Sequence, residues 1–345
     1  MSKRKPRAPY VLKKVVRESH KQDIDCLRKH PSFNDLFLTA SSEGKQIHLF
    51  NNNHCEGHLD LVSHYNHQDT IGGVCWANEN IVSFYDSKGR VYLIAIHFSR
   101  IEVIYEPMTQ NEGSINFMCS SYDYFNNRDQ PSYLFMILDG GLNVQIWNTT
   151  KHNCTCNIST SDDATFVYGV PVSYNQFLIF QSDGTISIIA LEGETVTISK
   201  INLDPESLLS ESISSSDIKH IHLVRNEDDS FLFFLTSNSL VQCFLNERLG
   251  SLEIISHQEL EETFGNVDSC IVVSDGKPQI MVGVPMGKHI TLYKAGQEGL
   301  EEFDLVKHNK KGASVSNAIL FSKSDEVDHV IAAIVGEASI LRLDK

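Results

Sequence analysis

A repeated pattern of apolar and polar positions runs along the whole chain. In its first copy, the apolar run at residues 36–40 is followed by Ser42, Glu43 and Gly44 and then by an alternating segment at residues 46–50. Two short strands joined by a tight turn produce this pattern, so it predicts a β-hairpin. The pattern recurs six times, with hairpin arms at 81–85 and 91–96, 133–138 and 143–147, 176–180 and 186–191, 231–236 and 240–245, 279–284 and 290–293, and 329–334 and 340–343.

Each hairpin is the centre of a larger unit. An apolar strand is predicted before each one, at residues 24–27, 71–76, 115–119, 165–170, 218–224, 268–273 and 317–321. More polar strands are predicted after the hairpins, for example at 59–64, 101–105, 195–201, 252–257 and 300–306. The turn centres are 44 to 54 residues apart, slightly more than the ~40 to 45 typical of a propeller repeat. Four strands per unit and seven units predict an all-β, seven-bladed β-propeller.

The two ends of the chain complement each other. The seventh unit stops at Lys345, directly after its third strand, while residues 11–17 form an alternating apolar and basic segment with no hairpin of its own. We therefore expect this segment to complete the last blade, with Val11 and Val15 covering its apolar face and removing an open sheet edge. The predicted organisation is a basic tail at residues 1–10 and a single propeller at residues 11–345.

Short motifs at the start of some units resemble those of the WD-repeat β-propeller family. Ser19-His20 stands where that family has Gly-His before the innermost strand, Asn66-His67 leads into Val74-Cys75-Trp76, and Lys307-His308 is a weaker copy. Only Trp147-Asn148 approximates the terminal Trp-Asp pair. The resemblance implies that His20, His67 and His308 are structural residues that hydrogen-bond within a blade and hold the loop.

The alternative kelch-type propeller would have a Gly-Gly doublet in most units. Only Gly72-Gly73 and Gly140-Gly141 provide one. The WD-like interpretation is therefore favoured, and the subfamily stays open.

Charge limits the classes of partner. The chain has a formal net charge of −15, and the first seventeen residues contain seven basic side chains and no acid. The remainder has 22 basic against 44 acidic residues, a formal charge of −22 that repels a phosphate backbone. We expect protein partners rather than direct nucleic-acid binding, although a nucleic-acid-associated factor that uses the basic N-terminus remains an alternative.

No apolar run reaches the ~20 residues that span a bilayer, and the N-terminus lacks the apolar stretch of a signal peptide. These features predict a protein of the nucleus or cytoplasm without membrane partners. The eight cysteines lack the dense spacing of a disulfide scaffold and are expected to be reduced.

Candidate chemistry is sparse. His152-x-Cys154-x-Cys156 and His54-Cys55-x-x-His58 lack the paired spacing of a structural zinc site, and an ordinary outer strand is favoured for the first set. The sequence has no glycine-rich phosphate loop and no nucleophile elbow. No catalytic residue, metal, cofactor or small-molecule substrate is predicted.

The sequence thus predicts a non-catalytic scaffold subunit that mediates protein–protein interactions in a multiprotein complex. The resemblance implies that partners contact the axial mouth, for which the candidates are Lys45, Asp69, Lys88 and Arg90. Charge reversal at the three basic residues among them is expected to cost the folded state little. The insertion at 204–216 is a second candidate surface, and residues 259–264 are predicted to form a short helix. The competing enzyme hypothesis is a propeller-based hydrolase that acts at the axial face on a modified protein.

Overall fold

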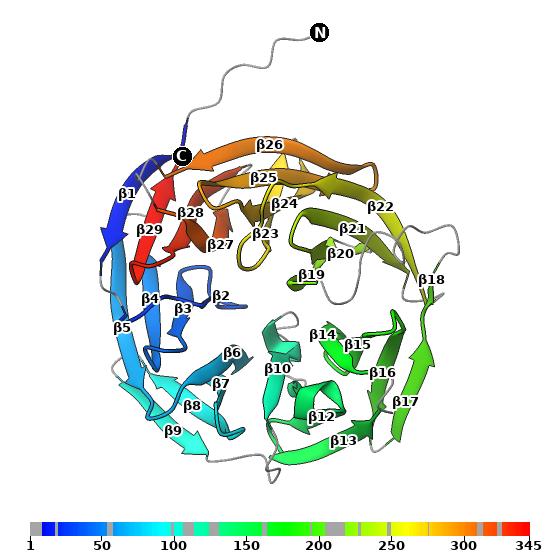
Figure 1. The fold of residues 1–345 in the computed structure, drawn as a ribbon. Coiled ribbons are helices and arrows are strands. Elements are labelled where there is room, and N and C mark those ends of the chain that lie inside the picture. The colour runs from blue at the N-terminus through cyan, green and yellow to red at the C-terminus, as the bar shows by residue number, and fades with distance from the viewer. Residues whose placement is uncertain are drawn as a thin grey trace.

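The computed structural model is a closed ring of β-sheets (Figure 1). It describes residues 9–17, 20–53, 58–97, 100–105, 114–123, 131–160, 164–193, 195–203, 218–226, 229–246, 250–274, 276–308, 313–322 and 326–345. Seven antiparallel blades surround a central axis, and each is an up-and-down sheet of four strands, which confirms the predicted fold. Blade 5 gains a short fifth strand, β18 (Asn202–Leu203), which pairs in parallel with its outermost strand.

The strands of each blade follow one another from the axis outward. Blade 1 contains β2 (Cys26–Lys29), β3 (Leu36–Ser41), β4 (Gln46–Asn53) and β5 (His58–Asn66); blade 2 contains β6 (Ile71–Asn78), β7 (Ile81–Asp86), β8 (Val91–His97) and β9 (Arg100–Tyr105); blade 3 contains β10 (Ile115–Ser120), β11 (Tyr133–Leu138), β12 (Asn143–Asn148) and β13 (Asn153–Ser159). Blade 4 contains β14 (Phe166–Ser173), β15 (Gln176–Gln181), β16 (Ile186–Glu192) and β17 (Thr195–Lys200); blade 5 contains β19 (His220–Asn226), β20 (Asp229–Leu235), β21 (Ser239–Asn246) and β22 (Ser251–Glu259). Blade 6 contains β23 (Asp268–Ser274), β24 (Lys277–Pro285), β25 (His289–Gly296) and β26 (Gly299–Lys307); blade 7 contains β27 (Val315–Ser322), β28 (Val327–Ile334), β29 (Ser339–Asp344) and β1 (Val11–Val16).

The core is divided among the blades. Buried apolar side chains form seven clusters, and each cluster lies between two neighbouring blades. Both faces of the middle strands are therefore buried, which explains why their sequences are nearly continuous apolar runs such as Tyr133–Leu138. Burial on both faces fixes each blade against the next, and the ring is a rigid frame.

The ring is closed by β1, as predicted. It pairs antiparallel with β29, from Val11 opposite Asp344 to Val16 opposite Ile340, with a bulge between Leu12 and Lys14 (Figure 1). The expected packing of Val11 is wrong, because this side chain is 52% exposed. The packing of Val15 is confirmed, because it lies against the apolar cluster between blades 6 and 7.

Two buried residues that the sequence did not single out also anchor the closure. Tyr10, at the end of the predicted tail, is 5% exposed and donates its hydroxyl to the Val327 carbonyl at 2.8 Å. Arg342 of β29 is 2% exposed and donates to Asn52 Oδ1 of blade 1 at 2.9 Å. Polar contacts thus accompany apolar packing where the two ends of the chain meet.

The predicted helix at residues 259–264 does not form. After β22 ends at Glu259, the backbone amide of Leu260 donates to the Asn238 carbonyl at 2.7 Å and that of Phe264 to the Pro285 carbonyl at 3.1 Å. The segment therefore satisfies its amides on neighbouring turns rather than within a helix. The insertion at 204–216 lies outside the described residues. The motif from His54 to His58 also lies outside them, except for His58. Within the described ranges, no helix has the length and apolar character needed to cross a membrane.

Candidate functional site

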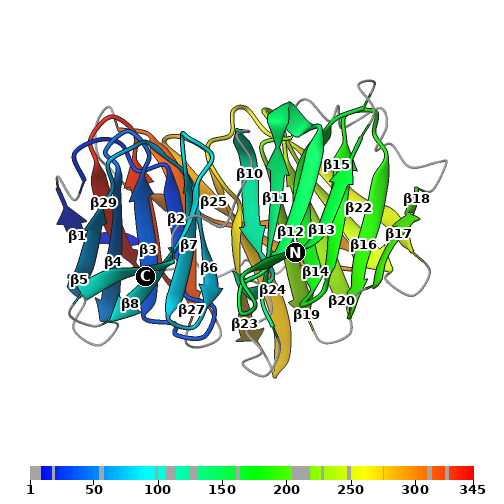
Figure 2. The same ribbon diagram turned by 90° about the horizontal axis from the view of Figure 1, so that it is seen from below.

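Two faces of the ring are distinguished by which turns lie on them. We call the AB face the one with the connections between first and second strands, such as β2 to β3, and the BC face the one with the β3–β4 and β7–β8 turns. All first strands run in one direction along the axis, so these two kinds of turn lie on opposite faces (Figure 2). The residues selected from the sequence lie at the BC face.

His20 and His67 hydrogen-bond within their blades, as the resemblance implied. His20 Nε2 lies 2.6 Å from Thr39 Oγ1, and the ring stacks on His48 with 3.9 Å between centroids. His67 Nε2 lies 3.4 Å from Asp86 Oδ2, and its Nδ1 lies 3.1 Å from the Tyr65 hydroxyl. His308 is buried before blade 7, at 4% exposure.

Asp69, Lys88 and Arg90 form one charged cluster around a buried residue, Asp86. Asp69 Oδ2 accepts from Lys88 Nζ at 3.0 Å and from Arg90 Nη2 at 2.7 Å. The Asp86 side chain is fully buried and lies 2.6 Å from Arg90 Nη2. Burial alone would raise the pKa of Asp86, but the hydrogen bonds from Arg90 and from turn amides outweigh it and lower the pKa.

The geometry corrects the expectation that charge reversal at this turn is nearly neutral. Arg90 neutralises a buried carboxylate, so its reversal would place two acids together inside the turn. Lys88, whose side chain is 60% exposed, is the member that can change at little cost. Lys45 is separate: its ammonium donates to the Gln68 carbonyl at 2.7 Å, and its backbone has a φ of 57°, where glycine is usual.

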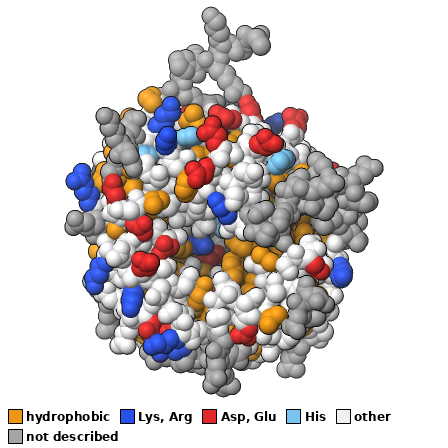
Figure 3. Space-filling view, viewed as in Figure 1, with side chains coloured by type: hydrophobic (Ala, Val, Ile, Leu, Met, Phe, Trp, Pro, Cys, Tyr) orange, Lys and Arg blue, Asp and Glu red, His pale blue; other side chains and the backbone are white. Residues whose placement is uncertain are grey.

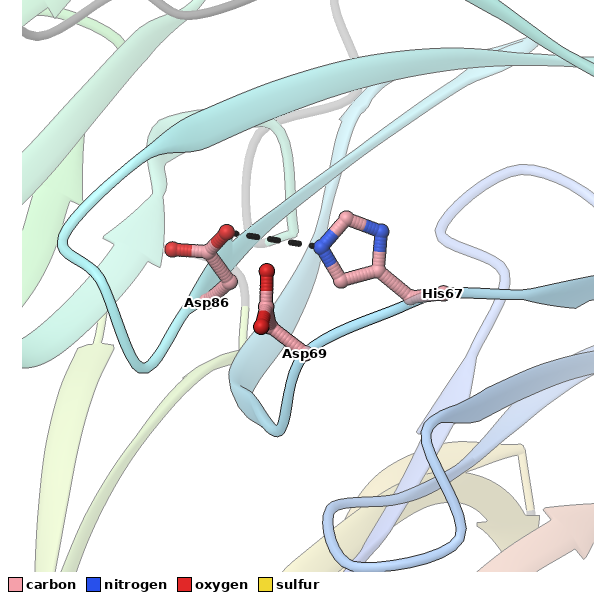
Figure 4. Close-up of side chains that lie close together, drawn as sticks. All are labelled: His67, Asp69 and Asp86. Atoms are coloured by element: carbon pink, nitrogen blue, oxygen red, sulfur yellow. Dashed lines mark hydrogen bonds and ion pairs between the residues drawn. The ribbon is translucent and has the colours of Figure 1, made fainter.

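The same cluster has the composition of a cation site. One ligand atom each from His67, Asp69 and Asp86 lies within 4.8 Å of the others (Figure 4). The Arg90 guanidinium already bonds both carboxylates, at 2.7 and 2.6 Å. The Arg90 guanidinium therefore neutralises both carboxylates, and the cluster stabilises blade 2.

A cavity of about 490 Å³ lies on the axis, lined by residues from all seven blades. None of Lys45, Asp69, Lys88 and Arg90 lines it, and their role as a partner-binding mouth stays a prediction. Figure 3 shows a hollow at the centre of the ring where basic, acidic and apolar side chains lie together. Its charged lining residues are Arg28, Lys29, Asp123, Arg225 and Asp268.

Both carboxylates of this cavity accept hydrogen bonds from backbone amides of the blades. Asp268 Oδ2 lies 2.8 Å from Lys29 Nζ and accepts from the Leu320 amide at 2.7 Å. Asp123 Oδ1 accepts from the Trp76 amide at 2.9 Å. Burial raises the pKa of Asp123 to about 7, with Arg28 acting in the opposite direction, so this carboxyl titrates near neutrality.

Two histidines of β19 line the cavity in neutral form. Burial lowers the pKa of His220 well below its usual value, and it lowers that of His222 to about 4. His220 Nδ1 accepts from the Val267 amide at 3.2 Å, which leaves the proton of the neutral ring on Nε2. His222 Nε2 lies 2.8 Å from Ser269 Oγ.

The cavity thiols do not resemble activated nucleophiles. Burial raises the pKa of Cys75 and Cys119 well above the ordinary value, so both remain protonated. The arrangement offers hydrogen-bond donors and positive charge rather than a nucleophile paired with a base. Sequence inspection missed these residues because they come from separate blades and meet only in the closed ring.

Large apolar side chains are exposed at the AB face. Phe33 lies in the β2–β3 loop at 42% exposure and Tyr174 in the β14–β15 loop at 38%. Ile271 and Val273 of β23 are 44% and 53% exposed. Residues on both sides of Phe33, Pro31 and Asn34, line the axial cavity together with Ile271, so exposed apolar side chains border this cavity at the AB face.

The sequence matches no protein-family model, and no curated protein matches it either.

Proposed function

We propose that the protein is a non-catalytic scaffold subunit, a divergent propeller of WD-repeat type, that docks other proteins within a nuclear or cytoplasmic assembly. The observation that favours this function is a rigid seven-bladed ring with large apolar side chains exposed at its AB face, where Phe33, Tyr174 and Val273 lie. Exposed aromatic and aliphatic side chains on a preorganised frame supply binding energy at little entropic cost.

The blade caps support the WD-repeat assignment. The His67 to Asp86 contact joins the loop before the first strand to the turn after the second, which is the role that the resemblance gives to this histidine. His20 occupies the corresponding position in blade 1 and bonds Thr39.

The partner we propose is a protein segment that combines an apolar anchor with basic residues. The anchor would cover the exposed side chains of the AB face, and the basic residues complement a chain with a formal net charge of −15. Lys88 on the BC face is a second candidate contact, because it is the most exposed of the basic residues in its cluster.

Affinity purification at native expression, followed by quantitative mass spectrometry, tests the proposal. The variant Phe33→Ser/Val273→Ser removes apolar groups from the AB face, and its matched control Leu61→Ser/Ile198→Ser removes groups that are 51% and 54% exposed on outer strands. Lys88→Glu tests the BC face. We expect the AB variant to lose partners that the control retains, with both proteins folded by circular dichroism. Retention of every partner by the AB variant and by Lys88→Glu would refute docking at either face.

A further inference from the structure

The innermost strand of blade 6, β23, has one edge that no other strand covers. On its other side it pairs with β24 along its whole length, without a bulge. The uncovered edge faces the axis, where Ser269 and Ile271 line the cavity. Figure 2 shows the β23–β24 hairpin reaching the lower edge of the ring, on the AB face.

The backbone groups of alternate β23 residues point toward this open edge. The Ser269 carbonyl accepts from Lys29 Nζ of blade 1, so the backbone groups of Ser269 point away from β24. Successive residues of a strand alternate in direction, so the backbone groups of Ile271 and Val273 point the same way. The pairing agrees with this direction, because Val273 lies opposite Pro278, which has no N–H to donate.

Other innermost strands have side chains bonded to their backbone near the axis. The Trp76 amide of β6 donates to Asp123 at 2.9 Å, and the Val172 carbonyl of β14 accepts from Arg225. Such contacts occupy the hydrogen-bonding groups of a strand edge and keep another strand from pairing with it.

The edge of β23 has no such cap beyond Ser269. Within the described residues, no other group bonds the backbone of Ile271 or Val273 at this edge. Their two side chains share one face of the strand and are 44% and 53% exposed, whereas Val272 between them is buried in the cluster between blades 6 and 7. An uncapped apolar edge of this kind is a template for strand pairing.

We propose that the open edge of β23, at Ile271 and Val273, binds an extended segment of a partner protein as an added β-strand. The inference rests on the proposed docking function and specifies how the AB face holds its partner. Backbone hydrogen bonds to these two residues supply affinity. Apolar residues two positions apart in the segment pack beside the two exposed side chains.

The surroundings favour a flexible segment with basic flanks over a second copy of the chain. The open edge borders a cavity of about 490 Å³ inside the ring, where one extended segment has better access than a folded four-stranded blade. The formal net charge of −15 attracts basic residues that flank the apolar centre of the segment.

Peptides selected on the full-length protein from a phage-displayed random library provide the probe, and fluorescence anisotropy measures the affinity of the enriched sequence. Proline is tolerated in an edge strand where its nitrogen faces away from the ladder. Ile271→Pro should therefore fold, and it should weaken peptide binding about tenfold or more, because it removes a backbone donor and crowds the edge.

The matched control is Ile198→Pro on the outer strand β17, where the side chain is 54% exposed. The Ile201 amide donates to the Ile186 carbonyl at 2.9 Å, so by alternation the Ile198 amide faces away from β16, toward an open edge at the rim. Ile198→Pro should bind the peptide as wild type does.

Two further measurements keep the test decisive if Ile271→Pro does not fold. Val273→Lys places a charge at an exposed position of the edge and should weaken peptide binding, while Ile198→Lys should not. Two peptides with N-methyl groups on alternate residues each block one edge of the added strand. One should lose binding and the other should keep it, because only one edge pairs with β23.

The outcomes separate this inference from the proposed function. Equal binding of both methylated peptides, equal binding by Val273→Lys and Ile198→Lys, or no enriched peptide would overturn the proposal. Retention of every co-purified partner by Ile271→Pro, with their loss from Phe33→Ser/Val273→Ser, would leave docking at the AB face intact and refute strand addition. Self-association of wild type that Ile271→Pro abolishes, measured by sedimentation velocity, would assign the edge to a second copy and overturn the proposed occupant.

Discussion

Blades 1 and 2 use different chemistry at the same place in the repeat. In each, a histidine before the first strand contacts a polar residue of the second strand. Blade 1 uses a neutral pair in which His20 stacks on His48 at 3.9 Å and bonds Thr39. Blade 2 uses charge, with His67 beside Asp86 and the acid paired to Arg90 at 2.6 Å. The histidine thus keeps its place in the repeat, while its partner and the chemistry of the contact change.

The difference arises from the residues that each histidine contacts. Burial, with the neighbouring His48 as a smaller cause, lowers the pKa of His20 to about 3, and burial with His64 nearby lowers that of His48 to about 4. In blade 2, a buried carboxylate is kept ionised by Arg90 and by turn amides. Blade 1 therefore depends on neutral imidazoles, and blade 2 depends on an intact ion pair.

The largest expected effect comes from Asp86→Ala. The substitution removes the acceptor of Arg90 and of two turn amides, so we expect the free energy of unfolding to fall by about 3 kcal/mol. Urea denaturation measures it, and Asp183→Ala, in the exposed β15–β16 turn, is the control. A loss below about 1 kcal/mol would show that the ion pair does not hold blade 2.

His20→Ala and His67→Ala should each cost about 1 to 3 kcal/mol, because each removes a hydrogen-bonded group from a blade cap. The comparison becomes sharper in a double-mutant cycle with Asp86→Ala. His67→Ala should couple to it, while His20→Ala should add to it independently, since the two caps lie in different blades. Equal coupling for both histidines would contradict separate caps.

Acidification should distinguish the two caps. A histidine with a lowered pKa stabilises the fold fully above its unfolded pKa of 6.5, and this stability is lost as the pH falls toward the folded values of about 3 and about 4. Asp86, whose pKa is lowered, loses its contribution only below about pH 4. His48→Gln should therefore flatten the decline of unfolding free energy between pH 6.5 and 4, measured by urea titration at each pH. Asp86→Asn should leave the slope of unfolding free energy against pH unchanged in this window. A flattening by Asp86→Asn alone would show that the loss of stability comes from the blade 2 carboxylate and not from the blade 1 histidines.

Lys88→Glu should have the smallest effect, below about 1 kcal/mol, because the Lys88 side chain is 60% exposed and Arg90 also neutralises Asp69. In 0.5 M salt, urea denaturation should give an even smaller difference in the free energy of unfolding between Lys88→Glu and wild type. A salt-independent loss of more than about 2 kcal/mol would mean that Lys88 is part of the buried network.

The strands were predictable because their signals are local. Alternation, apolar runs and turn residues recur in each unit, and the unpaired segment before the first unit indicated the closure by β1. The predicted helix at 259–264 failed because its amides bond neighbouring turns, which a local pattern does not reveal. The sequence did contain a signal for Asp86, since an aspartate at the start of the turn Asp86-Ser87-Lys88-Gly89 is a typical acceptor for amides two residues on.

The axial cavity was not predictable in the same way. Arg28, Asp123 and His220 are separated by about a hundred residues each and are brought together only by closure of the ring. No local pattern distinguishes Arg28 from an exposed strand residue. The same holds for Arg342, which meets Asn52 across 290 positions of sequence.

The most direct test of the docking account is hydrogen exchange of the full chain with and without its co-purified partner. The account predicts protection of peptides that contain Phe33, Tyr174 or Val273, while the outer strands β5 and β17 exchange at unchanged rates. Protection confined to those outer strands, with the AB face and the β7–β8 turn unchanged, would contradict it.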